Sequence, residues 1–325
     1  MYRLLALLLL VTASSTVFAA DTWGTAQLPG DVGTIGQVYK VRHDSPLYFR
    51  LNSAEFTVNQ VRIGDTLCTA NADQKLLILN FSVQNPQQQE LLVRADQLKM
   101  TVVDAVNVNH EAGNDWGEAG THAKIEMSLK PAQRIDAYTV IEVPAKGAIP
   151  KLMVMPMADD DGPVVRYDLR DKIAKLQPPI ADPADATGST ALEIVPAQLN
   201  TPCATGYFTV TVEKYQTIAT ALDGDAPAEG EHYFVATLLC HNMNADGRTL
   251  RYDTFVPTLK DADGLEMAYG GTLLGATANR AFDQEAKPDS SNRVRLYFTV
   301  PKDVQPKTLS LQEGSGRTYE FDVSK

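Results

Sequence analysis

The stretch "KLLILNFSVQN", residues 75–85, decides the fold. Its apolar residues recur at every second position, so they lie on one face of an extended strand. Several positions of the opposite face are apolar as well, which is typical of a strand that is covered on both sides. We therefore expect a central β-strand here. One face carries Leu77, Leu79, Phe81 and Val83, and the other carries Leu76 and Ile78.

A second stretch, "YFVATLLCHN" at residues 233–242, repeats this pattern 157 residues later. Both stretches end in an asparagine, Asn85 or Asn242, which we expect to be exposed and to form an Asx turn. Solenoid repeats have periods of only about 20–50 residues, so this offset indicates a tandem duplication of a whole domain. The offset also relates Asp96 to Asp253, Asp104 to Asp261 and Pro144 to Pro301.

Upstream of these stretches the two copies are aligned by a second motif. "EFTV", ending at Val58, matches "YFTV", ending at Val210. This alignment gives the second copy five extra residues, which we place in the turn-rich loop "DGDAPAEGE" at residues 223–231. Insertions in such loops cost little free energy.

The remaining pattern predicts an all-β protein of two tandem immunoglobulin-like β-sandwich domains. Short alternating stretches are separated by turn residues, as in that fold. Further strands are expected at residues 55–63, 97–104, 122–129, 135–143 and 151–156, and again at 207–215, 254–260, 292–300 and 307–312.

The first residues are typical of an export signal. Arg3 is followed by the apolar run from Leu4 to Val11, and "VFA" ending at Ala19 provides a cleavage site. The run is too short to span a membrane, which takes roughly 20 residues. We expect a signal peptide at 1–19, an N-terminal extension at 20–46, domain 1 at 47–172, a Pro- and Ala-rich linker at 173–190 and domain 2 at 191–325.

The charge balance excludes some partners. Cleavage after residue 19 removes one of the 29 basic residues and none of the 40 acidic ones, so the net charge changes from −11 to −12. Binding to nucleic-acid phosphates or to an anionic membrane surface needs clustered Lys and Arg, so neither partner is expected. No Gly-rich phosphate loop or nicotinamide fingerprint is present, and no cofactor is predicted.

Three features together resemble a known family. They are an "FTV" strand, the stretch that ends in asparagine, and a following strand that ends in aspartate. The chain is similar in these to the telokin-like, immunoprotective-type extracellular domain of bacteria. The resemblance implies an immunoglobulin-like sandwich on exported bacterial proteins, without an established activity or catalytic residues. The matching segments are 56–58, 77–85 and 98–104, then 208–210, 234–242 and 259–261; Cys240 and His241 depart from Val83 and Gln84 of the first copy.

The loop "NHEAGNDWGEAGTH", residues 109–122, is the best candidate for a binding site. Imidazole and carboxylate groups are suitable ligands for a divalent metal. An exposed Trp116 could instead stack on a sugar or a protein partner. A solvated loop without a function is the competing interpretation. The candidate metal ligands are His110, Glu111, Asp115, Glu118 and His122, and the candidate ligand contacts are Trp116, His110 and His122.

The cysteines allow one disulfide. Cys240 replaces Val83, and Cys203 lies five residues before Phe208, as Leu51 lies five before Phe56. If these two positions touch in the core, Cys203 and Cys240 form a disulfide in an oxidising compartment, and Cys68 stays free. Two buried free thiols are the alternative.

The sequence favours a non-enzymatic protein that binds, adheres or has a structural role. It would act in the periplasm or outside the cell, on an unidentified protein or glycan of the envelope. The alternative hypothesis is an enzyme or a metal-dependent ligand carrier that uses the 109–122 loop.

Overall fold

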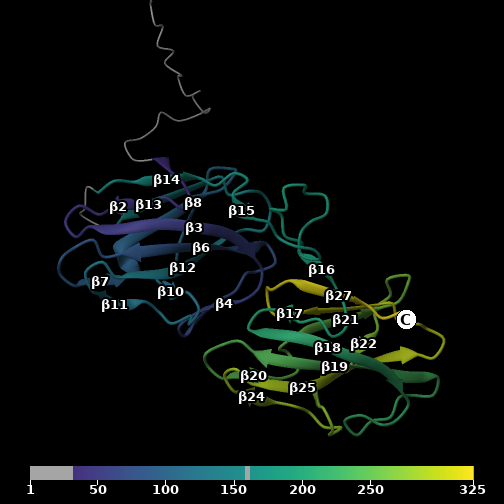
Figure 1. Cartoon of the computed structure of the whole chain (residues 1–325). Coiled ribbons are helices and arrows are strands. Elements are labelled where there is room, and N and C mark those ends of the chain that lie inside the picture. Colours follow the sequence, from purple (N-terminus) through teal and green to yellow (C-terminus); the bar gives the residue numbers. More distant parts are fainter. Residues whose placement is uncertain (1–31, 158–161, 325) are drawn as a thin grey trace, which may run out of the picture.

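The computed structural model describes residues 32–157 and 162–324, so the predicted signal peptide lies outside the described residues. The described chain is nearly all β (Figure 1). Its buried apolar residues form two large clusters, one between residues 41 and 191 and one between 195 and 323. We call residues 32–191 the first unit and residues 192–324 the second unit.

In the first unit two sheets enclose the core. One sheet has the order β1-β14-β13-β8-β9, and the other has the order β10-β12-β6-β3-β15, with β2 beside β3. The strands of the first sheet are β1 (Val32–Gly33), β14 (Val165–Asp168), β13 (Lys151–Pro156), β8 (Leu98–Val103) and β9 (Asn109–Glu111). Those of the second are β10 (Gly117–Glu118), β12 (Arg134–Pro144), β6 (Gln74–Gln84), β3 (Leu47–Thr57), β15 (Ile173–Ala174) and β2 (Tyr39–Val41). The smaller elements are β4 (Val61–Ile63) with β5 (Thr66–Cys68), β7 (Leu91–Arg94) with β11 (Glu126–Leu129), and the 3-10 helix η1 (Ala95–Gln97).

The second unit has a similar pair of sheets. Their orders are β16-β27-β26-β21 and β17-β18-β19-β25-β22, with β23 beside β25. The strands of the first sheet are β16 (Ile194–Ala197), β27 (Thr318–Asp322), β26 (Thr308–Gln312) and β21 (Val256–Lys260). Those of the second are β17 (Cys203–Ala204), β18 (Phe208–Ile218), β19 (Glu231–Asn242), β25 (Ser291–Pro301), β22 (Ala268–Tyr269) and β23 (Leu274–Gly275), and β20 (Arg248–Leu250) pairs with β24 (Gln284–Ala286).

The two quoted stretches form the central strands of their sheets. β6 lies between β3 and β12, and β19 lies between β18 and β25. Both faces of β6 are covered, since Leu76 and Leu77 are both fully buried. The prediction of a central, doubly covered strand is confirmed, and so is the β-sandwich fold class.

Asn85 and Asn242 form the predicted Asx turns, but they are fully buried rather than exposed. The backbone N–H of Gln87 donates to Asn85 Oδ1 over 2.9 Å, and that of Asn244 donates to Asn242 Oδ1 over 3.0 Å. Each side-chain amide also donates to backbone carbonyls across the turn and beyond it. Both asparagines therefore fix the end of the central strand from inside the protein.

The strand register corrects the predicted upstream alignment of the two units. In the first unit Leu51 is opposite Phe81, and in the second Val212 is opposite Leu238. A β-bulge follows at once in both units, so β3 matches β18 at an offset of 161 residues. The predicted match of "EFTV" to "YFTV" is therefore wrong, and the expected strand at 55–63 instead begins at Leu47.

The extra residues were predicted in the second unit, but the longer connection lies in the first unit. Residues 58–73 join β3 to β6, whereas the shorter segment 219–230 joins β18 to β19. The first unit uses its longer connection for the β4–β5 hairpin. That hairpin reaches the second unit, where Arg62 forms an ion pair with Asp289 at 2.9 Å and Gln60 donates to the carbonyls of Gly206 and Phe208.

Part of the segment predicted as an N-terminal extension belongs to these sheets. β1 pairs with β14, and β2 pairs with β3. Between them Gly36, with φ +84°, donates its N–H to Leu51 O. In the second unit Asn200, with φ +61°, donates to Val212 O in the same way. Glycine and asparagine are the residues that tolerate this left-handed backbone best.

The predicted linker, residues 173–190, folds as a closed loop against the first unit. β15 pairs with β3, and Ala181 bridges Ala191 across the base of the loop. The fully buried Lys75 holds the loop from inside. Its Nζ donates to Ala145 O and Gly147 O, at 3.1 and 2.8 Å, and also to Ser189 O. Burial lowers the pKa of Lys75 to about 8.

Replacing Lys75 with methionine is expected to open this loop, because the change keeps the apolar volume and removes all three donated hydrogen bonds. Cleavage by proteinase K within residues 178–190 should become at least several-fold faster, since proteases cut backbone that has lost its local structure. Mass spectrometry maps the cuts. Lys146→Met is the matched control, because Lys146 is exposed and makes only a surface ion pair with Glu193. Equal cleavage rates in both variants would contradict the role of Lys75.

Candidate functional site

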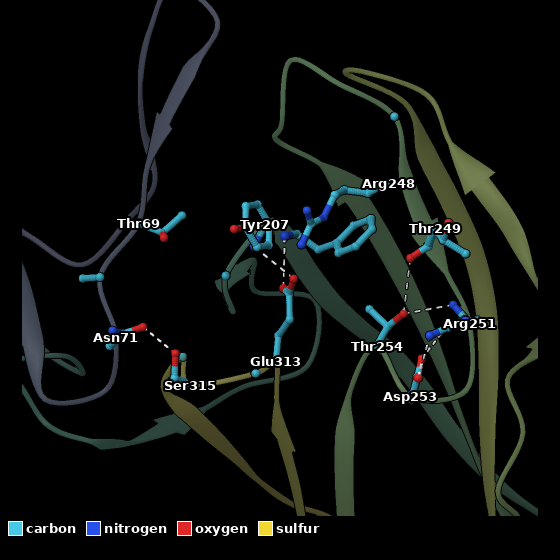
Figure 2. A pocket seen from close by; sticks show the side chains of 16 residues that line it. Thr69, Asn71, Tyr207, Arg248, Thr249, Arg251, Asp253, Thr254, Glu313 and Ser315 are labelled. Carbon is cyan, nitrogen blue, oxygen red and sulfur yellow. Dashed lines mark hydrogen bonds and ion pairs between the residues drawn. The ribbon is translucent and has the colours of Figure 1, made fainter. Parts of the chain in front are cut away.

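A polar pocket of about 730 Å³ lies where the two units meet (Figure 2). Four segments form it: residues 69–71 of the first unit, and residues 206–208, 247–254 and 313–316 of the second. The walls are joined by direct contacts, since Ser315 Oγ donates to Asn71 Oδ1 over 2.5 Å and Ala72 N–H donates to Ser315 O. The pocket therefore exists only in the packed arrangement of both units.

A buried carboxylate, Glu313, forms the floor of the pocket. Thr205 Oγ1 donates to it over 2.8 Å, and the backbone N–H groups of Tyr207 and Phe208 donate over 3.0 and 3.1 Å. Burial raises the pKa of Glu313, although these hydrogen bonds act in the opposite direction. The side chain is thus a fixed acceptor that holds the 205–208 turn in place.

Arg248 projects over this floor and stacks on Tyr207. Its guanidinium carbon lies 3.5 Å from the centre of the Tyr207 ring. Within the described chain the guanidinium donates no hydrogen bond to protein and forms no ion pair. Stacking leaves the in-plane N–H groups directed outward, and an arginine has five such donors. Arg248 can therefore offer donors to a ligand.

A neighbouring arginine is already engaged. Arg251 donates from Nε and Nη2 to the two carboxylate oxygens of Asp253, over 2.7 and 2.9 Å. This bidentate pair and the hydroxyl of Thr254, which accepts from the Arg251 N–H, fix the far wall of the pocket. Because its Nε and Nη2 groups hold Asp253, the orientation of Arg251 is fixed, and this residue shapes the wall of the site.

Glycines allow these chains to approach closely. A Cβ atom at Gly247 would lie 1.7 Å from Glu285 Oε1, and one at Gly316 would lie 1.9 Å from Thr205 O. Neither distance is sterically possible. A side chain at Gly316 would displace the backbone next to Glu313, whereas one at Gly247 would first displace the exposed side chain of Glu285.

The loop predicted as a metal site does not bring its candidate ligands together. His110 Nε2 lies 3.0 Å from Asp104 Oδ2, outside the predicted set. His122 Nδ1 lies 2.8 Å from the Tyr138 hydroxyl. Within residues 32–157 and 162–324 no three His, Cys, Asp or Glu side chains are placed to hold a metal ion. The carboxylates have separate partners as well: Glu111 pairs with Lys99, Asp115 with Lys124, and Glu118 with Thr121.

Trp116 is not available to a sugar or a partner, contrary to the prediction. Only 1% of its surface is exposed, and its ring lies 5.0 Å from that of Phe81, edge to face. The adjacent Gly117 pairs with Tyr138 of β12, which directs the loop back onto the core. The sequence offset of 157 residues contained the signal, because it relates Trp116 to Leu273, which is also buried.

The structure also contradicts the predicted Cys203–Cys240 disulfide, because all three cysteines are free. Val210 of β18 is opposite Cys203 on one side and opposite Cys240 on the other. The Cα atoms of the two cysteines are therefore separated by two strand spacings of about 4.8 Å each. This separation exceeds the Cα–Cα distance of about 7 Å that a disulfide can bridge. The register places Tyr39, not Leu51, at the position equivalent to Cys203.

No sequence pattern indicated the pocket residues. Tyr207 and Glu313 are more than 100 residues apart and lie in ordinary polar turns, and Arg248 begins the short strand β20. A glycine beside each of them was the one available hint, since Gly206, Gly247 and Gly314 flank these positions.

Comparison with known proteins finds similarity over parts of the chain but no activity. Residues 197–319, within the second unit, match the model of a domain of unknown function, DUF4352. An uncharacterized β-sandwich protein from Clostridium difficile 630 is 18% identical over 45% of this chain and 99% of its own, with a TM-score of 0.34. A "putative lipoprotein" (ycdA) from Bacillus subtilis is 10% identical over 40% of this chain and 37% of its own, with a TM-score of 0.27. No curated protein sequence matches the chain.

Within the described part of the chain, no helix has the length and apolar character needed to cross a membrane.

Proposed function

We propose that this protein is an exported, non-enzymatic binding protein of the bacterial envelope or the extracellular space, and that the pocket between its units is the ligand site. The signal-type segment at residues 1–19 supports export. The resemblance to exported bacterial domains agrees with it. The β-sandwich places the pocket on connecting loops, where binding residues of this architecture are commonly found.

One observation carries the proposal: Arg248 is held in place on Tyr207, yet its donors are not used by the described protein. An ordered guanidinium with open N–H groups loses little conformational entropy when it binds. The volume of about 730 Å³ lies within the usual range for ligand pockets, roughly 300–1,000 Å³.

The lining favours the hydroxyl-rich end of a glycan as the ligand. The exposed lining of the pocket is mostly polar and offers both donors and acceptors. Sugar hydroxyls both donate and accept, so they match such a surface. The hydroxyl and amide groups come from Thr69, Asn71, Tyr207, Thr249, Thr254 and Ser315.

The alternative of an enzyme or a metal-dependent carrier that uses the 109–122 loop finds no support in this geometry. His110 and His122 face different partners, and Trp116 is part of the core. The pocket between the units is therefore the better candidate.

A microarray of bacterial glycans tests the proposal with wild type, Arg248→Ala and Arg280→Ala. We expect wild type to bind a defined set of glycans and Arg248→Ala to bind them at least tenfold more weakly, which corresponds to about 1.4 kcal/mol. Arg280 is exposed and lies outside the pocket lining, so its variant should bind as wild type does. Absence of wild-type binding, or equal binding by all three proteins, would contradict the proposal.

A further inference from the structure

Strand β15 and the segment that joins β14 to it close one side of the first sandwich. After β14 the chain crosses from one sheet to the other, and β15 then pairs in parallel with β3, Ile173 opposite Ala54. Leu169 and Leu176 are buried on this path, and Ile173 packs against the same core. The crossing segment thus fills the gap between the sheets at their edge.

The second unit has the same layout up to this point. Leu169 N–H donates to Pro150 O after β14, and Val323 N–H donates to Lys307 O after β27. β18 takes the place of β3, with the same bulge. Within the described residues, however, no strand pairs with the outer edge of β18 beyond the short β17.

A groove of about 970 Å³ lies beside this edge. Much of its lining is apolar. Val195, Tyr319 and Phe321 are buried core residues that border it, and Pro196, Leu199 and Pro202 of the second unit are exposed in it. Pro178–Ile180 and Asn59 of the first unit form its other side, so the groove continues the contact between the units. Tyr215 of β18 lines it, and at the offset of 161 residues Tyr215 is the counterpart of Ala54, which β15 pairs with in the first unit.

We propose that this groove and the β18 edge bind an extended peptide segment of a partner protein, which adds a strand parallel to β18. Strand addition is a recurrent mode of peptide recognition in which backbone hydrogen bonds give affinity and side-chain pockets give specificity. The first unit shows the chemistry required, namely two apolar residues three positions apart, as Ile173 and Leu176 are. This site is separate from the polar pocket and does not depend on the proposed function.

Charge complementarity indicates which charges the partner peptide carries. Asp322 lines the groove, where its carboxylate also accepts from the N–H and the hydroxyl of Ser324, and acidic residues outnumber basic ones in the chain, 40 against 29. In the first unit Lys172 and Lys175 flank the apolar pair of β15. A peptide with basic residues around its apolar positions therefore fits the site best.

A synthetic peptide with the sequence of residues 169–177, "LRDKIAKLQ", is the first probe. We expect it to perturb backbone amide resonances of residues 213–218 in ¹⁵N spectra of the full mature chain. A control peptide with aspartate at the positions of Ile173 and Leu176 should bind at least tenfold more weakly. No perturbation at millimolar peptide, or perturbation confined to the polar pocket, would overturn the proposal.

Protein variants separate the groove from general surface effects. Ala197→Trp fills the groove and should weaken binding of the first peptide at least tenfold. Ala226→Trp places the same side chain on an exposed loop and should leave binding unchanged. Circular dichroism verifies that both variants are folded. Equal affinity of the two variants would overturn the proposal, and so would sedimentation data showing that a second copy of the chain occupies the same edge.

Discussion

Replacing Trp116 with alanine is expected to lower the free energy of unfolding of the first unit by about 3–5 kcal/mol, the usual cost of emptying a large aromatic site in a core. Trp116 is 99% buried and packs on Phe81, which in turn packs on Phe49 at a ring distance of 5.3 Å. The loop 109–122 should also become mobile, because its indole anchor is lost. Urea denaturation followed by far-UV circular dichroism measures the loss.

Two controls make this prediction specific to the core. Trp116→Phe keeps an aromatic ring and should cost clearly less than the alanine variant. His110→Ala changes the same loop at its half-buried pair with Asp104 and should also cost less. A loss below about 1 kcal/mol for Trp116→Ala would show that the indole is accessible, as the sequence suggested, because surface changes cost little.

Changing Asn242 to aspartate is expected to destabilise the second unit by about 3–5 kcal/mol at neutral pH, the range for an uncompensated buried charge. The amide donates to Asp246 O and Ala286 O over 3.0 and 2.9 Å. A carboxylate cannot donate, so both carbonyls would face a negative charge in a fully buried site. The acceptor bond from Asn244 N–H would be kept, so the effect isolates the donor role.

The sign of the pH dependence follows from the same geometry. Burial beside carbonyl oxygens raises the pKa of the introduced carboxyl above its unfolded value of about 3.9. The loss of stability is complete above the raised pKa and shrinks as the pH falls below it, because the protonated group donates again. Urea titrations at several pH values measure this. A deficit that is constant with pH would contradict the mechanism.

Asn85→Asp is the matched control in the first unit, where the same contacts occur. Trp116 is one of only two tryptophans, so its fluorescence reports on the first unit. If the units unfold separately, Asn85→Asp shifts the fluorescence transition and Asn242→Asp does not. A shift in both variants would contradict the predicted division into two domains.

The sequence predicted the local features correctly because each rests on neighbouring residues. The alternation in residues 75–85 identified a strand covered on both faces, since successive side chains point to opposite faces. The turns after Asn85 and Asn242 follow from a side chain that accepts from the backbone two residues on. The offset of 157 residues related these features in the two copies without any structural information.

Two predictions that depended on contacts between residues far apart in the sequence were wrong. The Cys203–Cys240 pair depended on aligning Cys203 with Leu51, and the register instead aligns it with Tyr39. The exposure of Trp116 was judged from a Gly-rich, polar loop, although its counterpart Leu273 indicated an apolar, buried position. Composition describes the neighbours of a residue in the chain, whereas burial depends on its neighbours in space.

The sequence by itself determined the all-β character, the central strands and the turns that end them, because period-two patterning and Asx geometry act over a few residues. Tertiary structure alone decided that Lys75 and Arg317 are buried, and that Arg317 ties the units together by donating to Leu192 O and Gln74 O. It also decided that Arg248, Tyr207 and Glu313 share one pocket. These contacts depend on how the two units pack. The packing surfaces are formed by segments that are far apart in the sequence, so no local sequence pattern encodes them.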